Sequence, residues 1–271
     1  MNDERKRWAL VTGASAGIGD AFARELAARG NSLVLTARRL DRLEALAGEL
    51  RAKHAIDAQC VAADLAQNDA VERLCAEIDK RGIAVDILIN NAGYGVPGSF
   101  ITPTWQTHSD FLSVMISAPC ELVYKLLPGM RERGYGRIAN IASLAGLVPG
   151  SAGHTLYAAS KAFLIKFSQS LAMENLDKGV NVCAVCPGFT YSEFHDVVGT
   201  RAKVSGMPAW MWSKAGDVAR EGLDALERGD IVCVTGRANR MIKSLFKLIP
   251  DGMALRMVQR RSRSFRNSTD T

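Results

Sequence analysis

The segment that decides the fold is Thr12-Gly13-Ala14-Ser15-Ala16-Gly17-Ile18-Gly19. It follows a short apolar run, residues 8–12, and leads into a helix-period stretch, residues 17–29. The three glycines permit a tight turn and a close approach of the backbone to a pyrophosphate, and the start of a helix adds free N–H groups and partial positive charge. Glycines also serve simple packing between helix and strand. The interpretation as a pyrophosphate-binding turn therefore depends on its position directly after a strand.

Short apolar, β-branched runs alternate with helix-period stretches along the whole chain. The predicted strands are residues 8–12, 32–37, 58–62, 85–90, 136–143, 180–186 and 231–235, and helical stretches include 17–29, 41–54, 69–80, 154–178 and 217–227. Strands that alternate with helices form right-handed βαβ units with helices on both faces of a parallel sheet. We therefore predict an α/β fold for residues 1–236: a single Rossmann-type doubly wound domain of about seven parallel strands. Residues 189–213, which follow a strand and include Trp210, Met211 and Trp212, are predicted to be a substrate lid.

Composition narrows the class of protein. The 271 residues are 48% hydrophobic and 23% charged, which excludes a disordered chain, a collagen-like repeat and a disulfide miniprotein. The net charge is +6, but residues 237–266 hold nine Lys and Arg and a single acid, a local charge of +8 that leaves −2 for the rest. A near-neutral body argues against a nucleic-acid-binding protein. The scattered cysteines show no spacing typical of a disulfide framework or a metal site, and a cytoplasmic protein is predicted.

Further motifs follow the glycine turn in a set order. They are Asp64-Leu65, Asn90-Asn91-Ala92-Gly93, Ser143, Tyr157-Ala158-Ala159-Ser160-Lys161 and Pro187-Gly188. With the TGxxxGxG spacing of the turn, the chain resembles the short-chain dehydrogenase/reductase family over roughly residues 8–235. The resemblance implies a homodimer or homotetramer, and a dinucleotide whose adenine contacts Asp64. The predicted cofactor-binding residues are Gly13, Ser15, Gly17, Ile18, Gly19, Arg38, Arg39, Asp64, Leu65, Asn91, Ala92, Gly93, Tyr157, Lys161, Pro187, Gly188, Thr190 and Ser192.

The end of the second predicted strand indicates which dinucleotide binds. Enzymes that use NAD place an acid there for the ribose 2′-hydroxyl, whereas cations accommodate the 2′-phosphate of NADP. Here the strand ends in Thr36-Ala37-Arg38-Arg39, and no acid occurs before Asp41. A guanidinium suits a phosphate and a carboxylate would repel it. We predict NADP(H), with Arg38 the better candidate of the two arginines, although both could simply be solvated residues before the next helix.

The predicted catalytic residues are Ser143, Tyr157 and Lys161. Tyr157 and Lys161 are four apart and share one face of a helix. A phenol has a pKa of about 10, and a nearby ammonium is expected to lower it and make Tyr157 a usable general acid/base. Ser143 is expected to end the fifth strand and hydrogen-bond a substrate carbonyl. The resemblance adds a contact between Lys161 and the nicotinamide ribose.

One position departs from the family pattern. Its members usually carry an Asn about thirteen residues before the Pro of an LPxM-like turn, and here the count back from Pro128 reaches Met115. A thioether is at best a weak hydrogen-bond acceptor and cannot replace the amide in placing a relay water. This substitution is the one feature that favours a non-catalytic NADP(H)-binding sensor. A hydrolase is a more distant alternative, because no nucleophile elbow surrounds Ser143.

Apolar side chains are expected to line a cleft for an apolar ketone or secondary alcohol, such as a long-chain 3-oxoacyl or steroid-like compound. They are Tyr94, Val96, Leu144, Leu147, Phe189, Phe194, Trp210 and Trp212, with His154 and His195 as polar candidates. The extension, residues 237–271, carries apolar residues at helical spacing among basic ones. Such a helix packs on its own subunit or a neighbour, the preferred interpretation, or else lies in a membrane interface.

Overall fold

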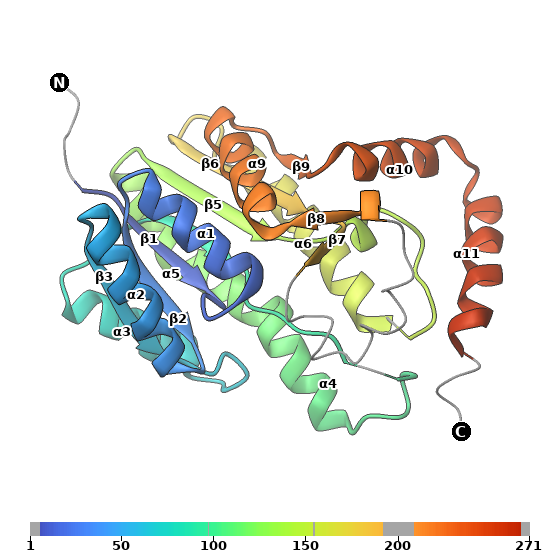
Figure 1. Ribbon diagram of the computed structural model, residues 1–271, viewed down its shortest axis with the longest axis horizontal. Helices are drawn as coiled ribbons and strands as arrows, with labels where there is room; N and C mark the ends of the chain where they lie inside the picture. Colours follow the sequence, from blue (N-terminus) through green and yellow to red (C-terminus); the bar gives the residue numbers. More distant parts are fainter. Residues whose placement is uncertain (1–5, 97, 154, 192–208, 267–271) are drawn as a thin grey trace.

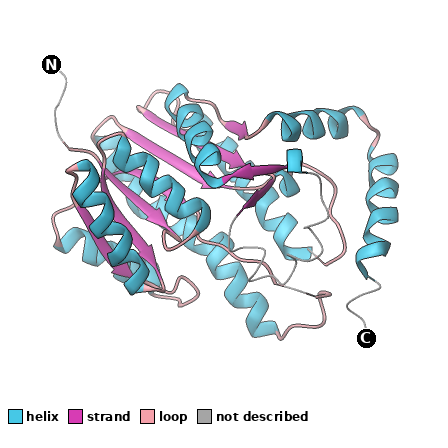
Figure 2. Ribbon diagram, viewed as in Figure 1, coloured by secondary structure: helices cyan, strands magenta, loops and turns pink. Residues whose placement is uncertain are grey.

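A central parallel sheet carries the molecule. The computed structural model describes residues 6–96, 98–153, 155–191 and 209–266. The strands, in the order in which they lie side by side, are β3 (Ala58–Ala62), β2 (Ser32–Ala37), β1 (Trp8–Thr12), β4 (Val85–Asn90), β5 (Gly136–Ile141), β6 (Val180–Cys186) and β9 (Val232–Val234). Every pair in this sheet is parallel. The predicted doubly wound fold with about seven parallel strands is confirmed (Figures 1 and 2).

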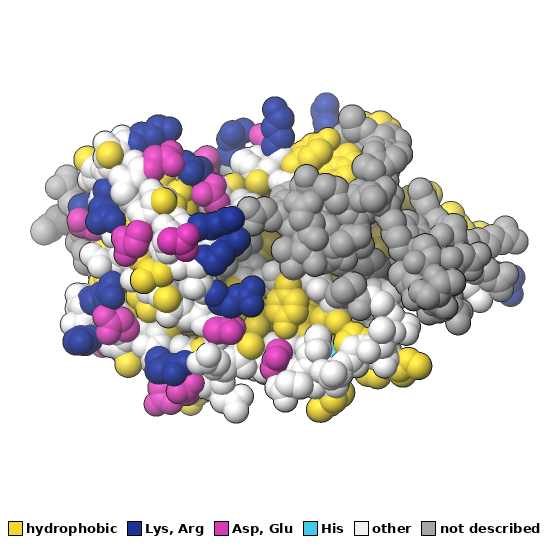
Figure 3. Space-filling view, turned by 60° about the horizontal axis from the view of Figure 1, so that its bottom comes forward, with side chains coloured by type: hydrophobic (Ala, Val, Ile, Leu, Met, Phe, Trp, Pro, Cys, Tyr) yellow, Lys and Arg dark blue, Asp and Glu magenta, His cyan; other side chains and the backbone are white. Residues whose placement is uncertain are grey.

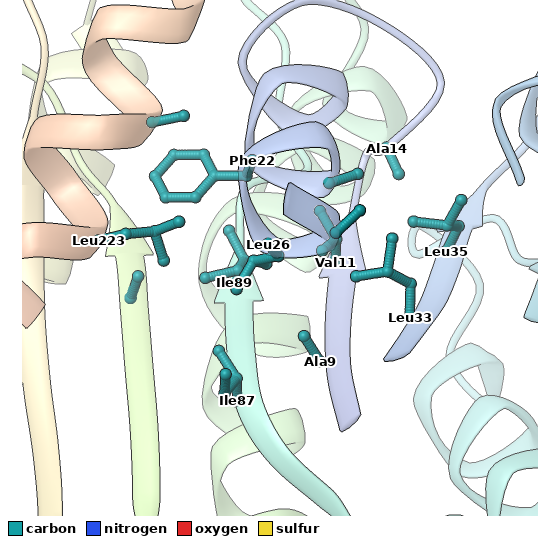
Figure 4. Packing of buried hydrophobic residues seen from close by; sticks show 14 of the residues in the cluster. Ala9, Val11, Ala14, Phe22, Leu26, Leu33, Leu35, Ile87, Ile89 and Leu223 are labelled. Carbon is teal, nitrogen blue, oxygen red and sulfur yellow. The ribbon is translucent and has the colours of Figure 1, made fainter. Parts of the chain in front are cut away.

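Helices cover both faces of the sheet. On one face lie α1 (Gly17–Ala28), α2 (Leu40–His54) and α9 (Ala215–Arg228), whose apolar side chains form one core with the strands. Figure 4 shows Phe22 and Leu26 of α1, with Leu223 of α9, above Val11 and Ile89 of the sheet. The opposite core is formed by α3 (Ala70–Lys80), α5 (Ala118–Glu132) and α6 (Thr155–Met173). Burial on both faces explains why the strands are continuous apolar runs rather than alternating ones.

The strand order places the ligand crevice. The chain winds outward through β1, β2 and β3 and then returns to the other side of β1 with β4. In open parallel sheets, ligands bind at the carboxyl ends of the strands where the order reverses, which here is between β1 and β4. The glycine turn follows β1 and the Asn-Asn-Ala-Gly motif follows β4. Both predicted motifs therefore lie at the same edge of the sheet.

The helical segment after β4 contains an irregular turn. It begins as α4 (Trp105–Leu112), passes through a π-helical turn (Ser113–Ser117) and continues as α5. Among the described residues, Trp105–Glu132 is the one helical segment long and apolar enough to cross a membrane by length and composition. Its side chains Val114, Leu122 and Met130 pack in the second core, and the core helix of a globular domain passes the same test.

Four segments differ clearly from the sequence prediction. The helix predicted at 154–178 ends at Met173, and turns follow it before β6. The fifth strand ends at Ile141 rather than 143, because a short 3₁₀ turn (Leu144–Gly146) follows and Ser143 caps it. The last strand is shorter than residues 231–235. The described ends of the predicted lid, β7 (Phe189–Tyr191) and β8 (Trp212–Lys214), pair as a small parallel sheet, with a 3₁₀ turn (Ala209–Met211) before β8. Residues 192–208 of that lid lie outside the described residues.

The extension forms two helices. From β9 the chain enters α10 (Arg237–Leu248) and then α11 (Asp251–Arg266), which Figure 1 shows along the edge of the molecule beyond the sheet. The amphipathic helix predicted within residues 237–271 corresponds to α10, and Pro250 lies between α10 and α11.

Candidate active site

The turn between β1 and α1 is shaped by glycine. Gly13 has a φ of +66°, a conformation that glycine adopts readily. A Cβ on Gly19 would collide with the carbonyl oxygen of Gly13 and the side-chain amide of Asn91. No side chain caps the N-terminus of α1 at Ala16, so the backbone N–H groups of its first turn remain available for an anion. Ser15, Gly17 and Ile18, also predicted to bind the cofactor, lie in this turn and first helical residues.

Hydrogen bonds join the ends of β1 and β4 beneath this turn. The Thr12 hydroxyl accepts from the backbone N–H groups of Asn91 and Ala92, each at 2.9 Å. The Asn91 side chain donates back to the carbonyl oxygens of Thr12 at 2.9 Å and Gly13 at 3.3 Å. The Asn91 amide therefore holds the glycine turn in place, and Ala92 and Gly93 continue along the same edge.

Two arginines follow β2, as predicted. Arg39 donates to the Ser15 hydroxyl at 3.1 Å, which ties the end of β2 to the glycine turn. Arg38 is exposed and lies within electrostatic range of the Tyr94 phenol. Figure 3 shows Lys and Arg side chains beside an apolar area on the side that faces the reader. Asp64 follows β3 and accepts from the Ala66 N–H, whereas the side chain of Leu65 is buried in the core, so only its backbone can face a ligand.

Ser143, Tyr157 and Lys161 come together as predicted. Ser143 follows β5 by two residues, and its hydroxyl accepts from the Ala145 N–H at 3.1 Å and is hydrogen-bonded to the Tyr157 phenol. α6 places Lys161 one turn after Tyr157, with its Nζ 5.6 Å from the centre of the tyrosine ring. The Lys161 ammonium is buried and donates to the Ile141 carbonyl at 2.7 Å.

Burial shifts the pKa of two of these groups. It raises the pKa of the Tyr157 phenol, and the hydrogen bond from Ser143 opposes that rise. It lowers the pKa of Lys161 to about 8. The expected lowering of the Tyr157 pKa is therefore wrong in sign for this structure, because desolvation of the buried phenol outweighs the hydrogen bond from Ser143. At neutral pH the phenol holds its proton, which is the form that can donate to a carbonyl oxygen.

Two supports of α6 were missed by the sequence reasoning. A Cβ on Gly146 would lie 2.6 Å from the backbone carbon of Lys161, so this glycine lets the turn after Ser143 pack directly on α6. Deeper in the core, Asn90 donates to Asn140 at 2.9 Å and Asn140 donates to Ser168 of α6 at 2.9 Å. This chain of buried hydrogen bonds links α6 to β4 and β5. Neither support has a spacing that could be recognised without the fold.

The predicted Pro187-Gly188 follows β6 and contacts the extension. A Cβ on Gly188 would collide with the side-chain amide of Asn239, in the first turn of α10. Asn239 is buried and donates to the Thr235 carbonyl at 2.8 Å. Thr190 lies in β7 and donates to the Gly188 carbonyl at 3.2 Å. Asn239 was also missed, because an Asn in an amphipathic helix carries no local signal; Ser192 lies outside the described residues.

Met115 occupies the π-helical turn and is buried. Its sulfur lies so close to Gly93 that a Cβ there would be 2.8 Å away. The thioether therefore packs against the Asn-Asn-Ala-Gly motif where the family pattern would place an amide. π turns occur frequently at functional sites, and this one retains the irregular backbone although the side chain is apolar.

Aromatic residues gather in two groups, one after β6 and one after β4. Trp212 stacks on Tyr191 with ring centres 4.7 Å apart and lies 5.8 Å from Phe189. Tyr94 packs edge-on against Phe111 at 5.6 Å. Of the other predicted lining residues, Leu144 and Leu147 pack against a core cluster, Val96 is half-buried, and Trp210 is exposed. Phe194, His154 and His195 lie outside the described residues.

Fold and site together define a Rossmann-type protein with a dinucleotide-binding turn and a Ser-Tyr-Lys cluster at the same edge of its sheet. The model of one family, short chain dehydrogenase, matches residues 7–202. The chain belongs to the short-chain dehydrogenase family, as its motifs predicted.

Two relatives and one solved structure illustrate the match. The chain is 41% identical over 205 residues to nodulation protein G of Rhizobium sp. (strain N33), which covers 75% of this chain and 81% of that protein. It is 36% identical over 195 residues to a very-long-chain 3-oxoacyl-CoA reductase of Anas platyrhynchos, covering 70% of this chain but only 62% of that longer protein. A short-chain dehydrogenase from Sphingobium yanoikuyae, solved in complex with NADPH, superposes with a TM-score of 0.77 at 31% identity over 90% of this chain and 96% of that one.

The residues present fit a dinucleotide. Gly19 leaves the turn free of a side chain at a point where a Cβ would collide with its neighbours. The N–H groups at the start of α1 are uncapped, and Arg38 is exposed after the end of β2. These are the three features that a pyrophosphate and a ribose phosphate require. The NADPH complex of the Sphingobium protein supports the predicted class of cofactor.

Proposed function

We propose that this chain is an NADP(H)-dependent carbonyl reductase, or alcohol dehydrogenase, that acts on an apolar ketone or secondary alcohol. The observation that carries the proposal is the Ser143–Tyr157–Lys161 cluster, assembled at the edge of the sheet that holds the glycine turn. Arg38 and Arg39 favour a cofactor with a 2′-phosphate. Aromatic side chains at Phe189, Tyr191 and Trp212 favour an apolar substrate.

The cluster divides the proton chemistry among three groups. NADP(H), when bound, supplies the hydride for the carbonyl carbon. Tyr157 gives its proton to the carbonyl oxygen, so that C=O becomes CH–OH, and the Ser143 hydroxyl donates a hydrogen bond to the same oxygen. The charge of Lys161 stabilises the phenolate that is left. Oxidation of the alcohol follows the same steps in reverse.

The substrate class that we favour is a long-chain 3-oxoacyl compound, with a steroid-like ketone second. The avian relative is named as a very-long-chain 3-oxoacyl-CoA reductase, which supports the first. We further propose a homodimer or homotetramer, as family membership suggests, and a cytoplasmic location in keeping with six free cysteines.

Cofactor binding and turnover test the proposal. Fluorescence titration would compare the affinities of the protein for NADPH and NADH. The decrease of NADPH absorbance would then measure the rate of reduction for a panel of ketones that includes a 3-oxoacyl thioester. We expect Tyr157→Phe to bind NADPH as tightly as wild type and to turn over about 10³-fold more slowly. Equal rates in the two proteins would contradict the assigned role of Tyr157.

Met115 favours one second candidate, a non-catalytic NADP(H)-binding protein. Its buried thioether offers little hydrogen bonding beside Gly93. If this candidate is right, wild type binds NADPH but reduces no ketone, and Met115→Asn, which returns the amide, gains measurable turnover.

A further inference from the structure

The exposed face of α10 is apolar. Met241, Leu245 and Leu248 are 73%, 53% and 83% exposed. Their spacing of four and three residues places them within about 60° of one another around the helix, so they form one stripe. Single exposed leucines are ordinary, but an aligned stripe of this kind marks a contact surface.

The orientation of this stripe is fixed by contacts at the start of α10. Asn239 is buried against Gly188, and Arg240 donates to the Glu221 carboxylate at 3.0 Å and to the Val234 carbonyl at 3.2 Å. On the helix, half-buried Ile242 and Phe246 lie on the side of the stripe away from the basic residues. α10 thus holds one side against the molecule and presents Met241, Leu245 and Leu248 outward.

α11 continues the pattern. Met253 and Met257, four residues apart on one side of the helix, are each about half exposed, whereas the neighbouring Ala254 is buried. We call these two residues and the stripe of α10 the extension face: Met241, Leu245, Leu248, Met253 and Met257. All five side chains are long and unbranched at Cβ, and such side chains adapt to an irregular or fluid partner.

Charge identifies that partner. Residues 237–266 carry nine basic residues and one acid, Asp251. Among the described residues, Arg237, Lys247 and Arg256 are exposed and form no ion pair. An isologous contact between two copies of the extension would bring two segments of +8 together, which is repulsive. An anionic lipid surface instead attracts this excess of positive charge and accepts the apolar side chains.

We propose that the extension face docks on the surface of a bilayer that contains anionic phospholipid. The apolar stripe enters the boundary between headgroups and acyl chains, and Arg237, Lys247 and Arg256 contact lipid phosphates and carboxylates. The contact is peripheral and reversible, and it does not require reductase activity.

Co-sedimentation tests this with the full chain and vesicles of phosphatidylcholine, alone or mixed with phosphatidylserine. We expect binding at least about tenfold tighter to the mixed vesicles, weakened by added salt. Met241→Gln/Leu245→Gln/Leu248→Gln should lose most of this binding, and Arg237→Gln/Lys247→Gln should lose the preference for anionic lipid. The matched control is Leu40→Gln/Met173→Gln/Leu176→Gln, which alters three exposed apolar residues on the body and should bind as wild type does.

Two outcomes would overturn the proposal. One is equal sedimentation of wild type and of the Met241→Gln/Leu245→Gln/Leu248→Gln variant with the mixed vesicles. The other is a wild-type protein that does not bind the vesicles, together with a variant of these three residues that forms a smaller assembly in sedimentation velocity. The extension face is then a contact between copies of this chain. Far-ultraviolet circular dichroism and NADPH binding, unchanged in every variant, would show that the loss is not one of folding.

Discussion

The cofactor side and the proposed substrate side of the site are built differently. On the cofactor side, the glycine turn, Thr12 and Asn91 are tied by backbone geometry and hydrogen bonds of about 2.9 Å, and a single Cβ at Gly19 has no room. On the substrate side, Phe189, Tyr191 and Trp212 contact one another through ring faces on a two-stranded sheet. The first arrangement accepts one ligand shape, whereas the second can admit many apolar ones.

The largest effect should follow a change on the cofactor side. Gly19→Ala places a methyl group on the Gly13 carbonyl oxygen and should weaken NADPH binding by about 10³-fold, since the turn must open to accommodate it. The matched control is Gly48→Ala in α2, where a Cβ meets open space; it should bind NADPH normally and gain up to about 1 kcal/mol of stability. Fluorescence titration and thermal unfolding measure the two effects. A folded Gly19→Ala protein with normal affinity would remove the distinction between the two sides.

Lys161 lies where the two sides meet, and its substitution should separate activity from stability. Lys161→Met should lower kcat by about 10²-fold or more, because the phenolate loses its cation. It should also raise the free energy of unfolding at pH 7 by about 1–3 kcal/mol, because a buried charge is removed.

The pH dependence of that stability gain has a definite sign. The pKa of Lys161 is lowered to about 8 in the folded protein, so the unfolded chain binds more protons between that value and its ordinary value of 10.5. Wild type therefore gains stability relative to Lys161→Met as the pH rises from 8 to 10. Denaturant unfolding at pH 7 and pH 10 checks this, and a constant difference between the two proteins would contradict the assigned burial of the charge.

A smaller effect is expected at Arg38. Arg38→Ala should weaken NADPH binding about 10- to 100-fold, the value of one charge-assisted phosphate contact, and change NADH binding by less than about twofold. Arg39→Ala serves as the comparison, because Arg39 already donates to Ser15 and should matter less. Titrations of both variants with NADPH and with NADH measure these affinities. An equal loss of affinity for NADH would show that Arg38 supports the glycine turn and does not bind the 2′-phosphate.

The smallest effect belongs to the substrate side. Trp212→Ala should raise KM for a bulky apolar ketone about tenfold and leave NADPH affinity unchanged, since it removes the ring contacts with Tyr191 and Phe189. Trp210→Ala, at an exposed tryptophan two residues earlier, should change neither. If Trp212→Ala alters NADPH binding instead, the two sides are coupled through β7 and β8.

The same difference explains what the sequence predicts well. Five of the seven strands have the predicted bounds, because a strand buried on both faces of a parallel sheet is a continuous apolar run. The Gly13, Ser143 and Tyr157 positions follow from short-range spacing on a turn, a strand end and a helix. Each such signal lies within a few residues of the group that it places.

The misses depend on contacts between distant residues. Gly146 packs on Lys161, and Asn239 packs on Gly188 some fifty residues away, so neither shows in a local pattern. The direction of the Tyr157 pKa shift follows from burial by the whole crevice rather than from the neighbouring lysine. The pairing of β7 with β8 joins segments separated by about twenty residues, and no local sequence motif predicts it.

The π-helical turn at Met115 has a consequence for the phase of the long helix around it. A π turn adds a residue to the helical repeat, which rotates everything after it by about 100° relative to an unbroken α-helix. On an unbroken α-helix Phe111 and Leu122, eleven residues apart, would lie about 20° from each other around the axis, whereas the π turn separates them by about 80°. Phe111 of α4 accordingly packs against Tyr94, and Leu122 of α5 packs in the second core. Deletion of one residue in Ser113–Ser117 would restore a regular helix and rotate α5 relative to the sheet. The π turn is therefore required for the packing of α5, although Met115 stands where the family pattern has an Asn.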